Sequence, residues 1–416
     1  MSPTRVVALL LLSVAMAAAV IAVAWDPSTI DVSPVVAARG VSTDATSDNG
    51  QKKLARTDHG TIYLAVSGPV DDVEQAQVLF SIDGGRSWKP DVVLAQPSVW
   101  SDLPTLAAGD GGRIDAAWVD YSGVGHVWYA SKQNEEWSDF VKISPGETYA
   151  GFPAMVIRDG VASLLWYAAP PDETREHGSA YEIFHSELFS GGWTTPELLS
   201  EGSEDALNPS LAQGPDSVLH GAWFQVEQGV YRAQHAVFDG EGWTVPALVS
   251  IREGTATGVA VEVDTSGVTH MVWEQAMDGS VGVAYARLEG GVWSEPVMLS
   301  YARAQDPVLA FAEDGRVGVV WSEDGEIMAR LFDGGWSPAS ALGPGVSPSL
   351  LSGEEILATW TRDTAAGAEV VVTPLTRGKS SGTLLLLWAV AAVSGLGGLA
   401  LMVWRRSVGD AGDGED

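Results

Sequence analysis

Tryptophan recurs along this chain in two series, and their spacing constrains the fold more than any other feature. One series ends short apolar runs, as in Ser217 to Trp223 and Gly267 to Trp273. Its members are Trp118, Trp166, Trp223, Trp273, Trp321 and Trp360, and Tyr63 takes the same place near the start. The other series opens Trp-Thr/Ser-x-Pro segments at Trp193, Trp243 and Trp293, with a shorter Trp-Ser-Pro at Trp336 and with Trp88 and Trp137 at the same place in earlier repeats; its members lie 43 to 56 residues apart. Such a period indicates a repeat architecture.

Each repeat predicts four short strands, because β-branched runs alternate with Gly, Asp and Asn turns. Four-stranded units of about this size are the signature of a β-propeller, in which each sheet buries its faces against its neighbours. A large indole in each blade then fills the wedge between sheets. We therefore expect an all-β propeller, with the tryptophans as packing residues.

The number of blades depends on how the ring closes. Seven inner positions occur but only six outer ones, so one outer strand is missing from the C-terminal repeat. The segment Trp25 to Ser33 resembles Trp293 to Ser300 and is expected to supply that strand, which avoids an open sheet edge. This gives seven blades. Six blades with a separate terminal strand are the alternative.

The motif Ser81-Ile-Asp83-Gly-Gly85-Arg-Ser-Trp88 resembles the Asp box, S-x-D-x-G-x-[ST]-W, of sialidases and other BNR-repeat propellers. The resemblance spans about residues 25–375 and implies a structural turn held by Ser81, Asp83, Gly85 and Trp88. In that family the Asp box lies opposite the active site. No Arg-Ile-Pro occurs here, so the sialidase arginine clamp is not matched and no catalytic residue is carried over.

Both ends of the chain are strongly apolar. Residues 6–24 follow Arg5 and close with Ala-Val-Ala, which predicts a signal peptide over 1–24 or, alternatively, an uncleaved anchor. Residues 383–404 carry no charge and predict a transmembrane helix, after a linker at 376–382 and before a short acidic cytoplasmic tail at 405–416. The propeller, residues 25–375, is then extracytoplasmic on a single-pass cell-membrane protein. Small residues at Ala391 and Gly395 have the spacing of a weak homodimer contact within the bilayer.

Charge and cysteine content remove several classes of function. The formal net charge is −31, which disfavours binding to the phosphate backbone of nucleic acid. The chain has no Cys, so disulfides, thiolate metal sites and cysteine nucleophiles are excluded. No Ca²⁺-type ligand loop is present, and we expect neither a metal nor a cofactor.

A binding site is expected on the face opposite the Asp box, where loops join the second to the third strand and one blade to the next. The longest such loop, Tyr167 to Tyr181, marks the third blade. Candidate ligand-binding residues on this face are Trp100, Asp120, Tyr121, Arg175, His177, Glu274, Glu323 and Arg362, with Asp102, Tyr149, Gln225 and Asp363 beside them. Acidic loops on an acidic protein are more often simply solvated.

Two functions remain open. The first is a non-enzymatic, surface-anchored module that binds a glycan or a protein, because the catalytic set of sialidases is missing. The alternative is a membrane-tethered glycoside hydrolase of the sialidase-like type, in which paired carboxylates act as acid and base.

Overall fold

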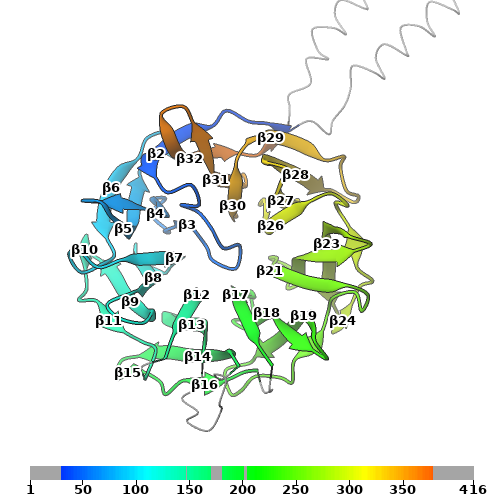
Figure 1. The fold of residues 1–416 in the computed structure, drawn as a ribbon, viewed down its shortest axis with the longest axis horizontal. Helices are drawn as coiled ribbons and strands as arrows, with labels where there is room; N and C mark the ends of the chain where they lie inside the picture. Colours follow the sequence, from blue (N-terminus) through cyan, green and yellow to red (C-terminus); the bar gives the residue numbers. More distant parts are fainter. Residues whose placement is uncertain (1–29, 147, 170–179, 201–203, 378–416) are drawn as a thin grey trace, which may run out of the picture. The chain divides into compact units, whose positions relative to one another are not determined.

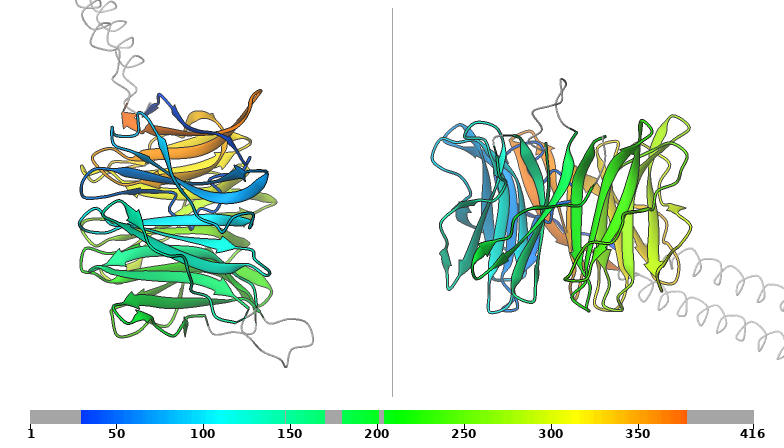
Figure 2. Two further views of the ribbon diagram at one scale, coloured as in Figure 1. Left: turned by 90° about the vertical axis from the view of Figure 1, so that its left-hand side faces the viewer. Right: turned by 90° about the horizontal axis from the view of Figure 1, so that it is seen from below.

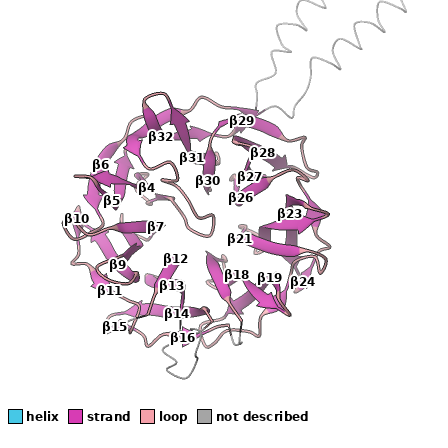
Figure 3. Ribbon diagram, in the orientation of Figure 1, coloured by secondary structure: helices cyan, strands magenta, loops and turns pink. Residues whose placement is uncertain are grey.

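A computed structural model describes residues 30–146, 148–169, 180–200 and 204–377. Its compact unit, Val32–Thr376, is a ring of seven antiparallel sheets around a central axis (Figure 1). The described residues form strands and loops and contain no helix (Figure 3). The seven-bladed propeller predicted from sequence is confirmed, and the six-bladed alternative is excluded.

The blades follow one another in chain order. Blade 1 consists of β3 (Leu54–Arg56), β4 (Ile62–Val70), β5 (Val73–Ser81) and β6 (Lys89–Val93). Blade 2 consists of β7 (Ser101–Ala108), β8 (Ile114–Asp120), β9 (His126–Gln133), β10 (Glu136–Trp137) and β11 (Val141–Lys142). Blade 3 consists of β12 (Ala150–Arg158), β13 (Val161–Ala168), β14 (Glu182–Phe189), β15 (Gly192–Trp193) and β16 (Glu197–Leu198). Blades 4 and 5 consist of β17 (Ala206–Gln213), β18 (Leu219–Glu227), β19 (Val230–Phe238) and β20 (Ala247–Leu248); and β21 (Thr255–Val263), β22 (Thr269–Met277), β23 (Ser280–Glu289), β24 (Val292–Trp293) and β25 (Val297–Met298). Blade 6 consists of β26 (Ala304–Phe311), β27 (Val317–Glu323), β28 (Glu326–Phe332) and β29 (Ser340–Pro344), and blade 7 of β30 (Val346–Leu351), β31 (Leu357–Thr364), β32 (Gly367–Pro374) and β2 (Val35–Val41).

The first strand of each blade lies nearest the axis, and the following strands step outward (Figure 1). The strands run between the two faces of the ring (Figure 2). Because neighbouring strands are antiparallel, the hairpins between strands one and two and between strands three and four share one face. The hairpins between strands two and three, and the links between blades, share the other, which we call the loop face.

The N-terminal part of the chain closes the ring. Strand β2 pairs with β32 in blade 7, with Val35 opposite Val372 and Arg39 opposite Glu369. Closure from this end was predicted, but the strand lies beyond the predicted segment Trp25 to Ser33. The segment Val35–Val41, which is apolar except for Arg39 and Gly40, supplies the pairing residues. The prediction rested on the likeness to Trp293 to Ser300 and did not consider this segment. Strand β1 (Ile30–Asp31) instead pairs with β33 (Thr376–Arg377).

The inner tryptophans form the cores between neighbouring blades. All six are at most 1% exposed, as the sequence predicted for packing residues: Trp118, Trp166, Trp223, Trp273, Trp321 and Trp360. Each of the first five belongs to a cluster that joins its own blade to the preceding one. Trp223 of blade 4, for example, packs in one core with Leu165 and Tyr167 of blade 3.

Blades 2 to 7 carry a bulge near the start of the first strand. At each bulge a residue with positive φ interrupts the register: Leu103, Phe152, Asn208, Gly258, Asp306 and Ser347. Proline follows in five of the six. Proline has no N–H to donate and is tolerated at bulges and on edge strands. The bulges therefore leave main-chain carbonyls next to the axis.

No helix in the described ranges is long and apolar enough to cross a membrane. The segments predicted to be a signal peptide, 1–24, and a transmembrane helix, 383–404, both lie outside those ranges.

Candidate functional site

The Asp box is a self-contained turn on the face opposite the loop face. Asp83 Oδ1 accepts hydrogen bonds from the backbone N–H groups of Arg86 and Ser87 at 3.0 and 2.9 Å. Asp83 Oδ2 accepts one from the Ser87 hydroxyl at 2.6 Å, and Ser81 Oγ donates to Oδ1 at 2.8 Å. These bonds lower the pKa of Asp83 to about 2. Both oxygens of the Asp83 carboxylate are therefore engaged in hydrogen bonds within the turn.

Six aromatic side chains of blades 2 and 3 gather on the loop face. We call Trp100, Tyr121, Tyr149, Phe152, Tyr167 and Tyr181 the aromatic platform. Trp100 is 51% exposed and stacks on Tyr121, with ring centroids 4.6 Å apart. Tyr149 continues the contact from Tyr121 at 6.5 Å to Tyr167 at 6.0 Å. Burial raises the pKa of Tyr121, Tyr149 and Tyr167. The phenols therefore stay neutral at physiological pH.

Two glycines make room for Tyr149 at the centre of the platform. A Cβ on Gly151 would lie 2.4 Å from the Tyr149 hydroxyl oxygen. A Cβ on Gly125 would lie 2.7 Å from the Tyr149 ring and 2.9 Å from the Tyr121 ring. Neither distance is compatible with an ordinary side chain. The sequence therefore allows this ring arrangement because both positions lack a side chain.

Residues 42–53, which we call the axial loop, leave β2 and enter the centre of the ring (Figure 1). Asn49 Nδ2 donates to Gly258 O at 2.7 Å and to Pro307 O at 2.8 Å. Gln51 Nε2 donates to Leu103 O at 2.8 Å and to Pro153 O at 3.2 Å. Two side chains thus satisfy main-chain carbonyls of blades 2, 3, 5 and 6.

The axial loop also reaches blades 4 and 7. Thr46 Oγ1 donates to Ser347 O of blade 7 at 2.7 Å. Gly50 sits so close to blade 4 that a Cβ there would meet Pro209 O at 2.5 Å. A cavity of about 20 Å³ lies between the axial loop and the first strands of blades 4 to 7. The axial loop therefore packs closely against the first strands of blades 2 to 7.

Carboxylates surround the loop-face end of the axial loop. Burial raises the pKa of Asp48 to about 6, while the charge of Lys53 opposes that rise. Burial, together with repulsion from Glu274 and Asp48, raises the pKa of Asp306 to about 7. Glu274 Oε1 accepts a hydrogen bond from the backbone N–H of Asp306 at 2.9 Å. These acids are close enough to influence one another's ionisation.

The structure brings some of the residues predicted from sequence together. Trp100 and Tyr121 are in contact within the platform. Glu274 lies at the axis with Asp306, and its other oxygen, Oε2, accepts from Thr257 at 2.9 Å. Arg175 and His177 lie outside the described residues.

The remaining predicted residues are engaged elsewhere. Asp120 is 2% exposed and accepts a hydrogen bond from the backbone N–H of Ser122 at 2.9 Å. Glu323 accepts from Trp321 Nε1 at 2.9 Å and from Ser300 Oγ at 2.6 Å. Arg362 donates twice to Glu369 within blade 7, at 2.7 and 2.9 Å.

Sequence reasoning missed Phe152, Asp48 and Asp306 as members of this region. Phe152 and Asp306 both precede a proline in a first strand, and both have positive φ. The proline that recurs near the start of the first strands was the sequence signal that could have identified both residues. Asp48 lies in the axial loop, whose sequence shows no repeat pattern.

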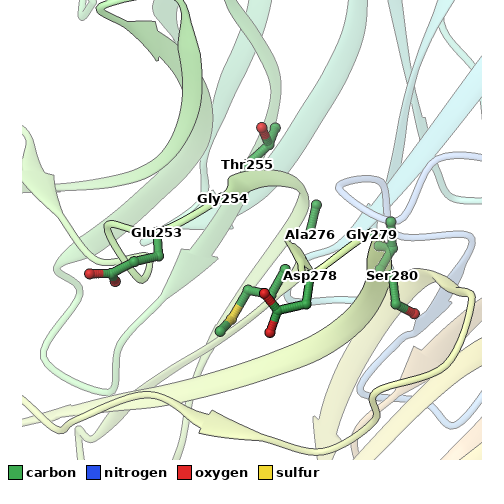
Figure 4. Close-up of a pocket in the computed structure, with 9 residues that line it drawn as sticks. Glu253, Gly254, Thr255, Ala276, Asp278, Gly279 and Ser280 are labelled. Carbon is green, nitrogen blue, oxygen red and sulfur yellow. The ribbon is translucent and has the colours of Figure 1, made fainter.

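A concave region lies on the loop face of blade 5. A cavity of about 490 Å³ is lined by Glu253, Gly254, Thr255 and residues 276–281 (Figure 4). Its acidic side chains, Glu253 and Asp278, come from two neighbouring loops (Figure 4). Within the described ranges, no group of three or more His, Asp or Glu side chains is arranged to hold a metal ion.

Comparison with known proteins places the fold but not the chemistry. No family model matches the sequence, and no curated protein matches it. Similar solved structures include an ulvan lyase of a polysaccharide lyase family, solved with a bound saccharide (10% identity, TM-score 0.55, 85% of this chain and 99% of that one). An α-L-arabinanase of Penicillium chrysogenum complexed with arabinobiose has 10% identity and a TM-score of 0.52, with the same coverage. A protein of unknown function from Dyadobacter fermentans has 12% identity and a TM-score of 0.53, covering 68% of this chain and 96% of that one. The chain thus has the β-propeller fold that the Asp-box resemblance implied, and shares it with these proteins.

Proposed function

We propose that this protein is a glycan-binding propeller whose ligand rests on the aromatic platform. The observation that carries the proposal is the exposed Trp100 ring, which is held in place by its stack on Tyr121 and backed by the tyrosines of blade 3. A sugar ring presents an apolar face of C–H groups and a rim of hydroxyls. Tyrosine and tryptophan suit such a ligand, because the aromatic ring packs against the C–H groups while the polar O–H or N–H group forms hydrogen bonds with the sugar hydroxyls.

The arrangement of the nearby carboxylates favours binding over catalysis. Asp102 Oδ1 accepts from the backbone N–H of Leu103 at 2.6 Å and from the Ser67 hydroxyl. Both oxygens of Glu274 are likewise occupied, by Thr257 and the Asp306 N–H. Carboxylates held in this way support the backbone, and the axial loop fills the axis beneath them. The shared fold with saccharide-bound propellers is consistent with the proposal but does not carry it.

A glycoside hydrolase is the second candidate, and Asp306 is the observation that favours it. A carboxyl group whose pKa lies near 7 beside an ionised partner can serve as a general acid. In that case Asp306 donates its proton to the leaving oxygen as the glycosidic C–O bond breaks, and Glu274 takes a proton from the water that attacks the anomeric carbon. Hydrolysis of a glycoside panel that disappears in Asp306→Asn would establish this candidate.

We also propose that the propeller is displayed on the outer side of a cell membrane. The support is the uncharged segment 383–404 and the export-type segment 6–24. On such a protein the loop face is available to polysaccharides outside the cell. Protease accessibility of the propeller on intact cells that express the full-length chain tests this placement.

Glycan binding is tested by titrating the purified full-length protein with a panel of oligosaccharides. Trp100→Ala should weaken the affinity of any bound glycan by about tenfold, on the scale of one lost aromatic contact. Tyr301→Ala is the matched control, because Tyr301 is a 75% exposed aromatic residue outside the platform. If no glycan binds, or if Trp100→Ala leaves the affinity unchanged, the proposal is wrong.

A further inference from the structure

The charges beside the aromatic platform bear on which glycans it takes, an inference that rests on the proposed function. We infer that the platform prefers amino sugars, whose units carry free ammonium groups, over neutral sugars and over uronic or sialic acids. The two features that lead to this inference are the exposed aromatic faces and the carboxylates of the axial region, which adjoin each other.

The aromatic faces are suited to a cation. The face of an indole or phenol ring is negative, and a cation within about 6 Å of it is attracted by this quadrupole, with tryptophan giving the strongest attraction. Trp100 offers such a ring at 51% exposure. Tyr121 lies against it, and Tyr149 continues the surface toward the axis. A protonated amino sugar gains from both the ring contact and the charge.

The axial loop adjoins the platform directly, because Gln51 donates to the carbonyl oxygens of Leu103, which follows Asp102, and of Pro153, which follows Phe152. The charges of Asp102 and Asp48 contribute to the raised pKa of Tyr121, after burial and the neighbouring Tyr149. Asp48 also contributes to the raised pKa of Tyr167. Negative potential from the axial loop therefore reaches two rings of the platform. Beyond Asp48 it is extended by Asp306 and Glu274.

The two lysines of the axial loop do not offset this charge at the platform. Lys53 is 1% exposed and donates to Gln51 Oε1 at 2.7 Å and to Pro104 O at 2.8 Å. Lys52 forms an ion pair with Glu262 at 2.8 Å. Next to the platform, the carboxyl groups of Asp48 and Asp102 thus face one buried ammonium group, and Glu274 and Asp306 add to them on the far side of Asp48. A carboxylated sugar placed there meets repulsion, whereas an ammonium group meets attraction.

The charges can be removed without straining the backbone. Asp48 and Asp306 have φ values of 73° and 52°. Asparagine adopts this left-handed region readily, so Asp→Asn removes charge and keeps shape. Asp159 provides a matched control, because its φ is 51° and it lies in the hairpin between β12 and β13 on the opposite face.

Calorimetric titration of the full-length protein compares three tetramers, of glucosamine, N-acetylglucosamine and galacturonic acid, in about 20 mM salt, where charges are weakly screened. We expect glucosamine tetramer to bind about tenfold more tightly than the acetylated tetramer, and galacturonate to bind most weakly. In the double variant Asp48→Asn, Asp306→Asn this advantage should fall to about threefold or less. Asp159→Asn should retain it.

The outcomes separate this inference from the function on which it rests. Equal affinity for glucosamine and N-acetylglucosamine tetramers, or tighter binding of galacturonate, overturns the inference and leaves glycan binding in place. A glucosamine preference that survives the double variant also overturns it, because the axial carboxylates are then not the cause. Binding of none of the tetramers, together with no response in the wider panel, removes the proposed function as well.

Discussion

The rings of Trp293 and His235 meet edge to face across the boundary between blades 5 and 4, with centroids 5.1 Å apart and an interplanar angle of 84°. The same contact recurs at three other boundaries. Tyr129 meets Trp193 at 5.0 Å, His185 meets Trp243 at 5.2 Å and Tyr285 meets Trp336 at 4.9 Å. An indole from the segment that follows the third strand of one blade thus packs on a third-strand ring of the blade before it.

The inner and outer tryptophans should therefore differ in their contribution to stability. Trp273→Ala empties a fully buried site and is expected to lower the free energy of unfolding by about 3–5 kcal/mol. Trp293 is half-buried, and Trp293→Ala should cost about 1–2 kcal/mol, from partial burial and one aromatic pair. Denaturant unfolding of the full-length protein measures both. Val292→Ala, at a 70% exposed site, is the control. Equal losses of stability for Trp273→Ala and Trp293→Ala would contradict the proposed difference between inner and outer tryptophans.

The buried histidines at these boundaries should make the fold sensitive to acid. Burial lowers the pKa of His185 and of His220 to about 4, and burial with the charge of His220 lowers that of His235 to about 3. Unfolded histidine titrates near pH 6.5. Below that pH the unfolded chain binds more protons, so stability present above pH 6.5 is lost as the pH falls toward 4. Each histidine contributes a slope of up to about 1.4 kcal/mol per pH unit.

His235→Gln isolates this effect, because it removes the proton site and keeps a polar side chain. We expect the free energy of unfolding of the variant to fall less steeply than that of the native protein between pH 6.5 and pH 4. His59→Gln serves as the control, since the His59 side chain is 69% exposed. Identical slopes in the native protein and His235→Gln would show that His235 is already charged in the folded state.

The tryptophan period predicted the blades because every wedge between sheets has the same shape and takes the same large side chain. Trp118 and Trp360 are 242 positions apart in the sequence, yet both are at most 1% exposed. Closure of the ring by the N-terminal end was also predictable, because blade 7 would otherwise lack its outer strand. The exact segment was not, because pairing of Val35–Val41 depends on β32, far along the chain.

Only those candidate-site residues that lie next to strands of the repeat were predicted from sequence. Trp100 and Tyr121 flank strands of blade 2, so their position on the loop face followed from topology. The axial loop could not be placed, because its order comes from main-chain carbonyls of several other blades. Asn49 and Pro307, for example, are 258 residues apart in sequence. Asp48 and Asp306 adjoin each other only as a result.

The axial loop should contribute to the stability of the whole ring. Gly50→Ala places a Cβ 2.5 Å from the backbone oxygen of Pro209, and a backbone atom cannot rotate away. Gln51→Ala leaves two carbonyls without their donor, at about 1–3 kcal/mol. We expect both variants to lower the unfolding midpoint in urea as one cooperative transition. Gly191→Ala is the control, because a Cβ there meets nothing within 4 Å. Loss of stability confined to blade 1, seen by hydrogen exchange, would contradict a role for the axial loop in the whole ring.

Asp306 should destabilise the fold in alkaline solution, opposite to the effect of the histidines. Its folded-state pKa, about 7, is above the unfolded value near 3.9. Between these values the folded protein binds the extra proton, so this contribution is present below pH 4 and is lost as the pH rises through 7. Asp306→Asn should thus raise the free energy of unfolding at pH 8, by about 1 kcal/mol or more, and this gain should shrink toward pH 5, where Asp306 is already protonated. Thermal unfolding of both proteins across this range measures the difference. A gain that is constant with pH would mean that the folded state does not raise the pKa of Asp306.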